Sequence, residues 1–358
     1  MITEPGKSRV ASLLYLSIND GLDPRINKEI FTLSASFAID FVGVSRHGQR
    51  PFFTDRARRI ELISGRSRSA LTLCKLWWRV FCLLWRNRYD SVHVINEDLY
   101  LVLLPLLLSQ QVVLDIFDSS FLKWNVPSWI VRLGQRLSYA LPKKIIVTDD
   151  ERASLMPKYV RDRLVVVPNY PLRYHGEVLT RDSHRMRILY AGSLMDRRGT
   201  SLVGKLLAAD EKLNVVMAGW IRDERTRVLA QHPRVEWLGT ITQHETITQA
   251  TRCDFILCHY EPSNLNNIYA SPNKIFDAIQ AGSAIIINPE VRASLFVHEH
   301  GLGVVLDAYE PSDMKDIVRQ LHEFKATYRP DPALREQFTW EKVTDRLEAA
   351  HRVMPAEC

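Results

Sequence analysis

The chain has 358 residues, of which 46% are hydrophobic and 25% are charged. This length is too great for one small core and fits two domains of ordinary size, and the composition excludes a disordered protein. The formal net charge is +6, which is compatible with nucleotides, anionic lipid headgroups or nucleic acid as partners.

Cysteine usage and the apolar segments both predict a cytoplasmic protein. The five cysteines are odd in number and form no Cys-x-x-Cys pair, and four lie in apolar runs, which predicts reduced, buried thiols. The first residues lack the pattern of a signal peptide. Of the longest apolar segments, charges interrupt 70–85, and 99–108 is about half of the ~20 residues that span a bilayer. We therefore expect no membrane-spanning helix.

Short apolar runs alternate with helical patterns along the whole chain. Most runs are continuous in Val, Ile and Leu, as expected for parallel strands that are covered on both faces. The alternation predicts an α/β protein with doubly wound parallel sheets and right-handed crossovers. The predicted strands are 10–17, 38–45, 91–95, 111–118, 144–148, 164–167, 187–191, 214–218, 235–238, 254–259, 284–288 and 304–306. The predicted helices are 27–37, 69–87, 129–140, 200–208 and 273–281.

A polar segment divides the chain into two halves. Residues 168–185 contain two prolines, a glycine and no apolar periodicity, which is typical of a linker. We expect an N-terminal domain over 1–170, a linker over 171–186, a C-terminal domain over 187–338 and a final helix within 339–358. Ligands of open α/β sheets bind at the carboxyl ends of the strands, so the loops that follow the strands should carry the chemistry.

The stretch ILYAGSLMDRRGTSLVGKLL, residues 188–207, has the features of a phosphate site. A strand leads into Gly192 and Ser193, and a polar loop with Arg197 and Arg198 precedes a glycine and a helix. Small residues let a ligand approach the backbone, and helix-start amides with two guanidinium groups suit a phosphate. A surface loop with solvated arginines is an equally common reading of this pattern.

The stretch YASPNKIFDAIQAGSAIIINPE, residues 269–290, contains a second candidate. Ser271 is a natural N-cap and Pro272 suits the first helical turn. Lys274 adds charge at the positive helix end, Asp277 lies one turn on, and Gly282 ends the helix. A phosphate near the lysine and a sugar hydroxyl pair near the aspartate would fit a ribose phosphate. A surface Lys–Asp pair is the alternative, and the two arginines of the earlier loop favour the ligand.

Several motifs together resemble those of GT-B glycosyltransferases. YAGSLMDRRG, VVMAGW, VEWLGTI, SPNKIFDAIQAGSAIIINPE and FTWEKVTDRL come in the order and spacing of this group, most closely of family-4-like bacterial enzymes that build cell-surface polysaccharides. DPRINKEI, YDSVHVINED, VVLDIFDSS and VVPNYP extend the resemblance over nearly the whole chain. It implies two Rossmann-like domains that face each other across a cleft, with the final helix crossing back to the first domain.

The resemblance also implies the ligands. The second domain would bind a nucleoside-diphosphate sugar, UDP- or GDP-linked with UDP favoured, and the first a glycan or lipid-linked glycan acceptor in exopolysaccharide or O-antigen-type synthesis. No further cofactor and no nucleic acid are expected. Arg198 would contact the donor diphosphate, Lys274 is the basic residue of the S-P-x-K motif, and Asp277 replaces a glutamate that holds the ribose. The expected donor-site residues are Gly192, Ser193, Arg197, Arg198, Gly219, Trp220, Leu238, Ser271, Asn273, Lys274 and Asp277.

Two positions depart from the family pattern. Tyr269 stands where the first glutamate of a double-glutamate motif would be, and Ser193 stands where an arginine often follows the loop glycine. Two other functions therefore stay open: a nucleotide-sugar epimerase of the same fold, which would need acid/base pairs, and a non-catalytic nucleotide-sugar-binding partner of a polysaccharide assembly complex.

The expected chemistry follows from charge. Negative charge grows on the departing diphosphate during sugar transfer, and fixed cations stabilise it. The chain has no Asp-x-Asp element, so no metal is expected and Arg198 and Lys274 take the catalytic role. Asp118 is the first candidate for a base near the acceptor and Asp20 the second, although aspartates in such loops more commonly cap helices. A retaining enzyme, which we favour, needs no protein base.

The segment 71–90 combines Trp77, Trp78 and Trp85 with basic residues. A basic, Trp-bearing amphipathic helix fits an anionic membrane surface, and a helix that covers the sheet fits the same pattern. Lipid-linked acceptors are common in the family that the chain resembles. We expect a cytoplasmic protein with peripheral contact at the inner face of the membrane.

Overall fold

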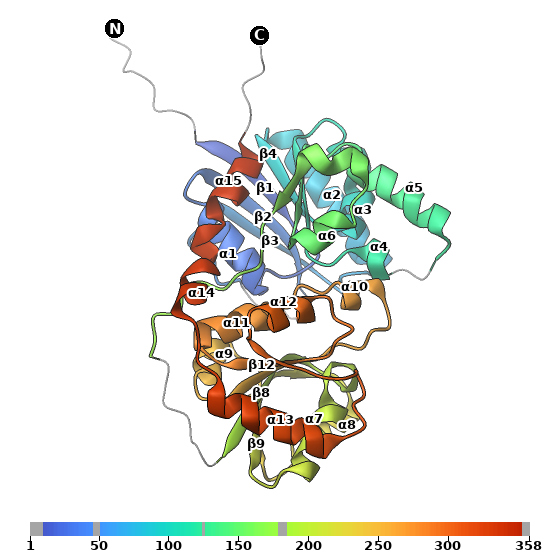
Figure 1. The fold of residues 1–358 in the computed structure, drawn as a ribbon. Coiled ribbons are helices and arrows are strands. Elements are labelled where there is room, and N and C mark those ends of the chain that lie inside the picture. The colour runs from blue at the N-terminus through green and yellow to red at the C-terminus, as the bar shows by residue number, and fades with distance from the viewer. Residues whose placement is uncertain (1–9, 46–50, 124–125, 178–184, 353–358) are drawn as a thin grey trace. The chain divides into compact units, whose positions relative to one another are not determined.

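The computed structural model describes residues 10–45, 51–123, 126–177 and 185–352. The chain forms two compact units, Met1–Pro168 with Val343–Cys358 and Asn169–Lys342. Each unit is built on one sheet in which all the paired strands are parallel (Figure 1). The predicted α/β class with two parallel sheets is therefore confirmed.

The first unit holds a seven-stranded sheet. Its inner strands are mostly apolar and buried, because helices cover both faces. In sheet order they are β3 (Arg59–Ser64), β2 (Phe37–Ser45), β1 (Ala11–Leu16), β4 (Ser91–Ile95), β5 (Val112–Ile116), β6 (Lys144–Val147) and β7 (Leu164–Val166). Its helical segments are α1 (Pro24–Leu33), α2 (Ala70–Arg86), α3 (Glu97–Leu107), α4 (Ser120–Lys123), α5 (Ser128–Tyr139), α6 (Asp150–Ser154), the 3-10 helix η1 (Lys158–Arg163) and α15 (Thr344–His351).

The chain's last helix, α15, belongs to the first unit. It packs against α1 and β7, and Figure 1 shows this red helix beside the blue α1. His351 is buried there, with its Nδ1 2.9 Å from the Ser91 hydroxyl and its Nε2 3.0 Å from His93 Nδ1. Burial lowers the pKa of His351 to about 3. The helix is thus attached by neutral imidazoles inside the core.

A buried charged network lies beside this contact. The Arg25 guanidinium pairs with Glu29 at 2.7 Å and with Asp115 at 3.0 Å, and donates to the Val167 carbonyl at 2.8 Å. Tyr15 donates to Glu29 at 2.5 Å. Burial, followed by the charge of Asp115, holds the pKa of Glu29 well above its usual range. One buried guanidinium is thus shared by two buried acids inside the core.

The second unit holds a six-stranded sheet. In sheet order its strands are β10 (Val235–Trp237), β9 (Leu213–Ile221), β8 (Met186–Leu194), β11 (Phe255–Cys258), β12 (Ala284–Ile287) and β13 (Gly303–Val305). Its α-helices are α7 (Thr200–Ala209), α8 (Glu224–Leu229), α9 (Gln243–Ala250), α10 (Leu265–Ile268), α11 (Asn273–Ala281), α12 (Ala293–Glu299), α13 (Met314–Thr327) and α14 (Pro332–Gln337). Two 3-10 helices, η2 (Asp196–Arg198) and η3 (Trp340–Lys342), complete it.

Part of the segment predicted as a linker packs onto the second unit. Tyr174 is buried and its amide donates to the side-chain oxygen of Gln280 at 3.1 Å. The Trp340 amide donates to the Pro171 carbonyl at 2.8 Å. Residues 178–184 of the predicted linker lie outside the described residues.

The apolar-run pattern misses one strand, and the expectation of buried thiols is wrong for one cysteine. Strand β3 escapes the apolar-run pattern because it is an edge strand that pairs only with β2 and exposes or half-buries every side chain; its Glu61 even pairs with Arg79 of α2. The expectation of buried thiols fails at Cys74, which is exposed on α2, whereas Cys253 and Cys258 are buried.

Candidate functional site

Two glycines open the backbone at the carboxyl ends of the central strands of the second unit. Gly192 of β8 and Gly219 of β9 are register partners with φ of 98° and 136°. A Cβ on Gly219 would lie 1.9 Å from the Gly192 carbonyl oxygen, so no larger residue fits. A Cβ on Gly192 would meet only the Lys274 side chain, at 3.8 Å. This edge of the sheet therefore presents bare backbone next to a lysine.

The loop after β8 is held in one conformation. The Tyr190 hydroxyl bonds both the amide and the carbonyl of Met195, at 2.9 and 2.8 Å. Asp223 accepts from the Asp196 amide at 2.7 Å. Gly199 ends the loop with φ of 116° and is the N-cap of α7. The loop thereby presents the neighbouring Arg197 and Arg198 from fixed backbone positions.

The two arginines have different surroundings. Arg197 is exposed, and its Nε lies 3.6 Å from a Glu261 carboxylate oxygen. The Arg198 guanidinium carbon lies 3.9 Å from the centre of the Tyr260 ring. Among the described residues, no carboxylate forms an ion pair with Arg198 within 4.0 Å.

Helix α11 brings a second cation to the same ring. It begins at Asn273, and Pro272 is its N-cap without a side-chain capping bond. The prediction of Ser271 as N-cap and Pro272 in the first turn is thus wrong by one residue, because Pro272 has extended rather than helical backbone angles. Gly282, with φ of 67°, ends the helix as predicted.

Lys274 completes the cationic cluster. Its Nζ lies 5.8 Å from the centre of the Tyr260 ring. Burial, with the nearby Arg198 charge, lowers the pKa of Lys274 to about 8, although Cys258 and Asp277 act in the opposite direction. Beneath it, burial raises the pKa of the Cys258 thiol to about 12, so this sulfur stays neutral. Two cations thus share one aromatic ring and repel each other, and a bound anion would relieve this repulsion.

Asp277 lies one turn on from Lys274 but is not a surface residue. It is buried and accepts a hydrogen bond from the Gln243 side-chain amide at 2.9 Å. The alternative of a surface Lys–Asp pair is therefore wrong, whereas the ribose role stays a prediction. The remaining predicted donor-site residues lie at or near the same strand ends. Ser193 pairs with Trp220 in the β8–β9 ladder, and the Trp220 side chain is exposed. Leu238, Ser271 and Asn273 are half-buried.

The sequence did not reveal the residues that hold the Tyr260 backbone in place. The fully buried Asn288, just after β12, accepts from the Tyr260 amide and donates to its carbonyl, both at 3.0 Å. It also donates to Glu290 at 2.8 Å, and Glu290 accepts from the Tyr309 amide at 2.9 Å. A signal was nevertheless present in the sequence. Tyr260 follows β11 and Asn288 follows the neighbouring β12, so both residues lie at the same edge of the sheet.

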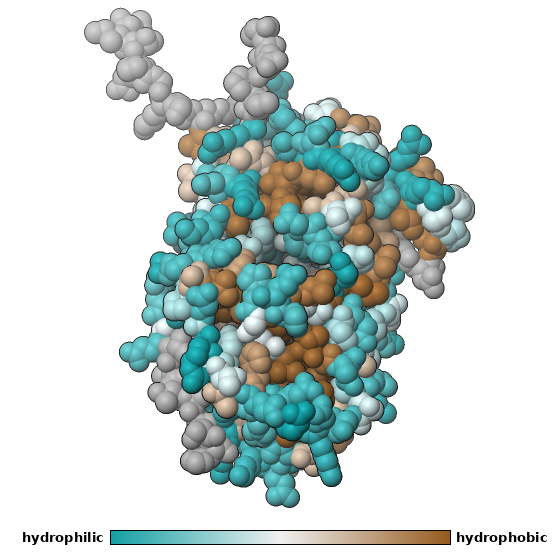
Figure 2. Space-filling view, in the orientation of Figure 1, coloured by the Kyte–Doolittle hydropathy of each residue, from teal (hydrophilic) through white to brown (hydrophobic). Residues whose placement is uncertain are grey.

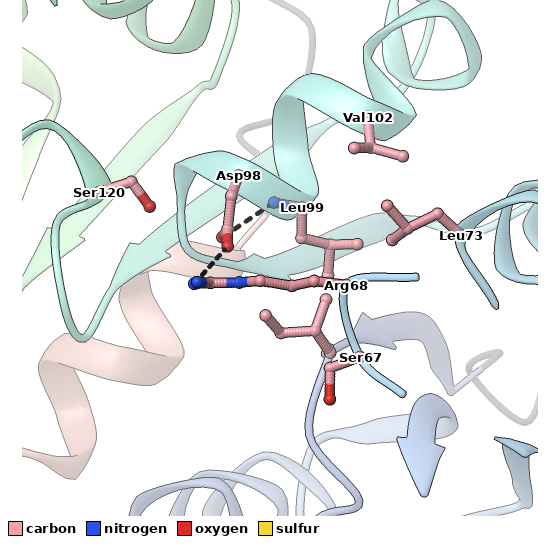
Figure 3. A pocket seen from close by; sticks show the side chains of 8 residues that line it. Ser67, Arg68, Leu73, Asp98, Leu99, Val102 and Ser120 are labelled. Atoms are coloured by element: carbon pink, nitrogen blue, oxygen red, sulfur yellow. Dashed lines mark hydrogen bonds and ion pairs between the residues drawn. The ribbon is translucent and has the colours of Figure 1, made fainter. Parts of the chain in front are cut away.

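The first unit has a pocket of about 260 Å³ at the carboxyl edge of its own sheet (Figure 3). Arg68 and Asp98 form an ion pair at 3.3 Å across it, and Asp98 also accepts from the Leu99 amide at 3.0 Å. The lining residues are Ile18, Ser67, Arg68, Leu73, Asp98, Leu99, Val102 and Ser120. One wall is therefore apolar, and the mouth carries hydroxyl and charged groups.

A strained turn and a buried acid support this pocket. Asn96 has φ of 62° and ψ of 157°, a conformation that is costly outside glycine. Its side-chain oxygen accepts from the Phe117 amide at 2.9 Å and joins the ends of β4 and β5. Glu97 is buried and accepts from Ser119, Ser120 and Tyr139. Burial raises the pKa of Glu97.

The two aspartates predicted as bases lie near this edge in separate settings. Asp118 is more than half exposed, and its carboxylate lies 3.1 Å from Lys123 and 3.9 Å from Arg152. Asp20 accepts from the Leu22 amide at 3.2 Å in a local turn. The structure therefore leaves Asp118 as an ion-paired surface carboxylate whose catalytic role stays a prediction.

Comparisons with known proteins address the fold. No family model matches the sequence, and no curated protein matches it. Among solved structures, a sucrose-phosphate synthase from Thermosynechococcus elongatus has a TM-score of 0.64 and 16% identity, with 95% of each chain covered. Anabaena HepE in complex with UDP and glucose has a TM-score of 0.67 and 12% identity, covering 94% of this chain and 98% of that one. The lipopolysaccharide galactosyltransferase WaaB, in its apo form, has a TM-score of 0.63 and 12% identity, covering 95% and 98%.

The chain has the GT-B fold. The predicted resemblance is confirmed at the level of the fold, since these similarities extend over nearly all of each chain. In this GT-B chain, the bare backbone at Gly192 and the cations above Tyr260 lie at the strand ends of the second unit, and the pocket lies at those of the first. Among the described residues, no helix is long and apolar enough to cross a membrane.

The GT-B chain also contains a group of metal-ligand residue types away from these edges. Glu29, His93 and Asp115 bring their ligand atoms within 4.8 Å of one another in the first unit. Arg25 is bonded to both carboxylates, however. The guanidinium already supplies the positive charge that a metal ion would bring.

Proposed function

We propose that this protein transfers a sugar from a nucleoside-diphosphate sugar, with UDP as the favoured nucleotide, to a glycan or lipid-linked glycan acceptor. The process would be exopolysaccharide or O-antigen-type synthesis. The observation that carries the proposal is the convergence of Arg198 and Lys274 on Tyr260, beside backbone that Gly192 leaves open. UDP is favoured because the HepE neighbour is a complex with UDP and glucose.

Each donor part has a proposed position. The diphosphate lies against Arg198, Lys274 and the amides at the start of α11, because charge-assisted bonds and the helix dipole favour an anion there. The ribose lies toward Asp277, and Trp220 and Leu238 border the base. Gly192, Ser193 and Gly219 provide close backbone approach, while Arg197, Ser271 and Asn273 complete the rim.

The chemistry we propose is metal-independent and retaining. The bond between the sugar's anomeric carbon and the diphosphate oxygen breaks, and the acceptor oxygen bonds to that carbon. The departing diphosphate takes the acceptor proton, so no protein base is required. Arg198 and Lys274 stabilise the charge that grows on the diphosphate, in positions fixed before the reaction. Asp118 remains the candidate base if the acceptor proton goes to the protein instead.

Incubation with a panel of nucleotide sugars tests the proposal. Release of nucleoside diphosphate with a glycan acceptor, undiminished by EDTA, is the expected result. One structural neighbour, a UDP-N-acetylglucosamine 2-epimerase with a TM-score of 0.56 and 12% identity, makes epimerisation the second candidate. Formation of an epimeric sugar would support that candidate. Tight binding without turnover would support the non-catalytic partner that Tyr269 suggests.

Asp277→Asn should weaken UDP binding by about ten- to a hundredfold. The exchange keeps the shape but turns ionic hydrogen bonds from the ribose hydroxyls into neutral ones, at a cost of roughly 1–3 kcal/mol. Calorimetric titration with UDP and with its 2′,3′-dideoxy form measures the effect. The dideoxy ligand should bind the wild type poorly and bind both proteins almost equally. If Asp277→Asn lowered the affinity for both ligands equally, Asp277 would have only a structural role, through its hydrogen bond with Gln243.

UDP affinity should fall as the pH rises through the pKa of Lys274, which is about 8. Below it the ammonium is already charged, so affinity is level; above it, binding must take up a proton, and affinity falls by up to about tenfold per pH unit. The ligand does not cause this fall, since phosphate second pKa values lie near ~6. Lys274→Arg should bind with a flat profile, because arginine stays charged. Calorimetric titrations of the wild type and Lys274→Arg with UDP at several pH values test this. The same change of affinity with pH in both proteins would contradict the prediction.

A further inference from the structure

An exposed apolar stripe runs along α5. Trp129, Leu133 and Leu137 are four residues apart and are 60%, 52% and 47% exposed. Only Ser138 and Tyr139 of this helix are buried. Figure 1 shows α5 extending outward beyond α3, and Figure 2 shows hydrophobic atoms on it beside hydrophilic ones. The outer face of α5 thus has no partner within the described part of the first unit.

Helix α2 carries a second stripe. Leu71, Trp78 and Trp85 are seven residues apart, on one side of the helix, and are 68%, 62% and 80% exposed. The opposite side buries Leu76 and Val80 in the core. The sheet-covering reading of this helix is therefore confirmed for one face, whereas the membrane-surface reading stays a prediction.

The two stripes belong to one layer of helices. Helix α3 packs against both α2 and α5, and Leu108 just beyond its end is 64% exposed. We name the outer side of α2, α3 and α5 the α2–α5 face. Its α2 and α3 helices also supply Leu73, Leu99 and Val102 to the pocket of the first unit, so the face adjoins that pocket.

The exposed charges of α2 and α5 have one sign, whereas α3 carries Glu97 and Asp98 in its first turn. Neither α2 nor α5 contains Asp or Glu. Arg132 and Arg136 are exposed next to the α5 stripe, and Lys75 and Arg86 are exposed on α2. An ordinary solvated surface mixes both signs, whereas outward tryptophan and leucine flanked only by cations match the interface of an anionic bilayer.

We propose that the α2–α5 face docks onto an anionic lipid bilayer. Trp129, Leu133, Leu137, Trp78 and Trp85 enter the headgroup region, and the flanking cations bind lipid phosphates. Docking would place the mouth of the adjoining pocket close to the lipid surface, where a lipid-linked acceptor has its sugar. That last step rests on the proposed function; the docking itself rests only on the face.

Co-sedimentation of the full chain with vesicles tests the docking. The protein should bind vesicles that contain phosphatidylglycerol, bind pure phosphatidylcholine vesicles far less, and lose binding with added salt. Trp129→Ser/Leu133→Ser/Leu137→Ser should weaken binding by about tenfold or more, and Arg132→Gln/Arg136→Gln by about fivefold per arginine. Val228→Ser and Arg329→Gln, exposed positions of the second unit, should change nothing.

Unchanged UDP affinity in every variant keeps this test separate from the proposed function. Stripe variants that bind the vesicles as the wild type does would overturn the proposal. So would a wild-type dimer that these variants convert to a monomer in light scattering, because the face would then cover a second copy of the chain.

Discussion

Sugar transfer should be almost completely lost when Arg198 and Lys274 are both replaced by alanine. Each cation is expected to make a charge-assisted bond to the diphosphate that contributes ~1.5–3 kcal/mol, so each single variant should lose about ten- to a hundredfold in UDP affinity. In the double variant, the loss of UDP affinity should be smaller than the product of the two single losses. The two effects are not independent, because both cations lie at one ring and contact one ligand. The transfer rate of the double variant should fall further, since the diphosphate charge is largest in the transition state.

A matched control lies in the neighbouring helix α8. Arg225 is exposed and pairs with Asp196 at 2.7 Å, next to the loop that carries Arg198. Arg225→Ala removes a cation of the same region without touching the proposed ligand, and should leave UDP affinity within about twofold. Calorimetric titration and steady-state transfer measure both variants. Undiminished UDP binding by the double variant would remove this cluster from the donor site.

The fold is readable in the sequence where burial alone decides the pattern. Strand β12, with Ala-Ile-Ile-Ile, is apolar on both faces because it is buried on both. The edge strand β3 alternates polar and apolar residues and stays half-buried, so no apolar run marks it. The local sequence pattern therefore does not predict a strand whose exposure results from its position at the edge of the sheet.

The candidate site divides in the same way. Glycines with positive φ and the lysine of a helix start are local features, and they could be predicted. The stacking of Arg198 on Tyr260 and the clamp of Asn288 on Tyr260 join segments that the sheet order brings together, far apart in sequence. Residue spacing along the sequence therefore cannot predict these two contacts. The lowered pKa of Lys274 depends on the same tertiary packing.

The buried ion pair of Arg25 with Asp115 joins distant parts of the first unit, and it should contribute strongly to the stability of that unit. Arg25→Met should destabilise that unit by about 3–5 kcal/mol, because it leaves the buried Asp115 without its guanidinium partner. Thermal or urea unfolding of the full chain measures the loss. UDP affinity should persist in conditions where the first unit still folds, since the proposed donor residues all belong to the second unit.

The size of that loss should depend on pH. In Arg25→Met the Asp115 pKa in the folded state should rise further above its unfolded value, so the stability of the variant falls as pH rises through that folded pKa. The difference from the wild type should therefore be smaller at pH 5 than at pH 8. Arg25→Met/Asp115→Asn removes the unpaired charge and should recover much of the loss, whereas Arg319→Met, at an exposed ion pair, should cost under about 1 kcal/mol. A loss that is independent of pH and is not recovered by Asp115→Asn would mean that Arg25 acts by packing against Phe117, 4.8 Å away, and not by its charge.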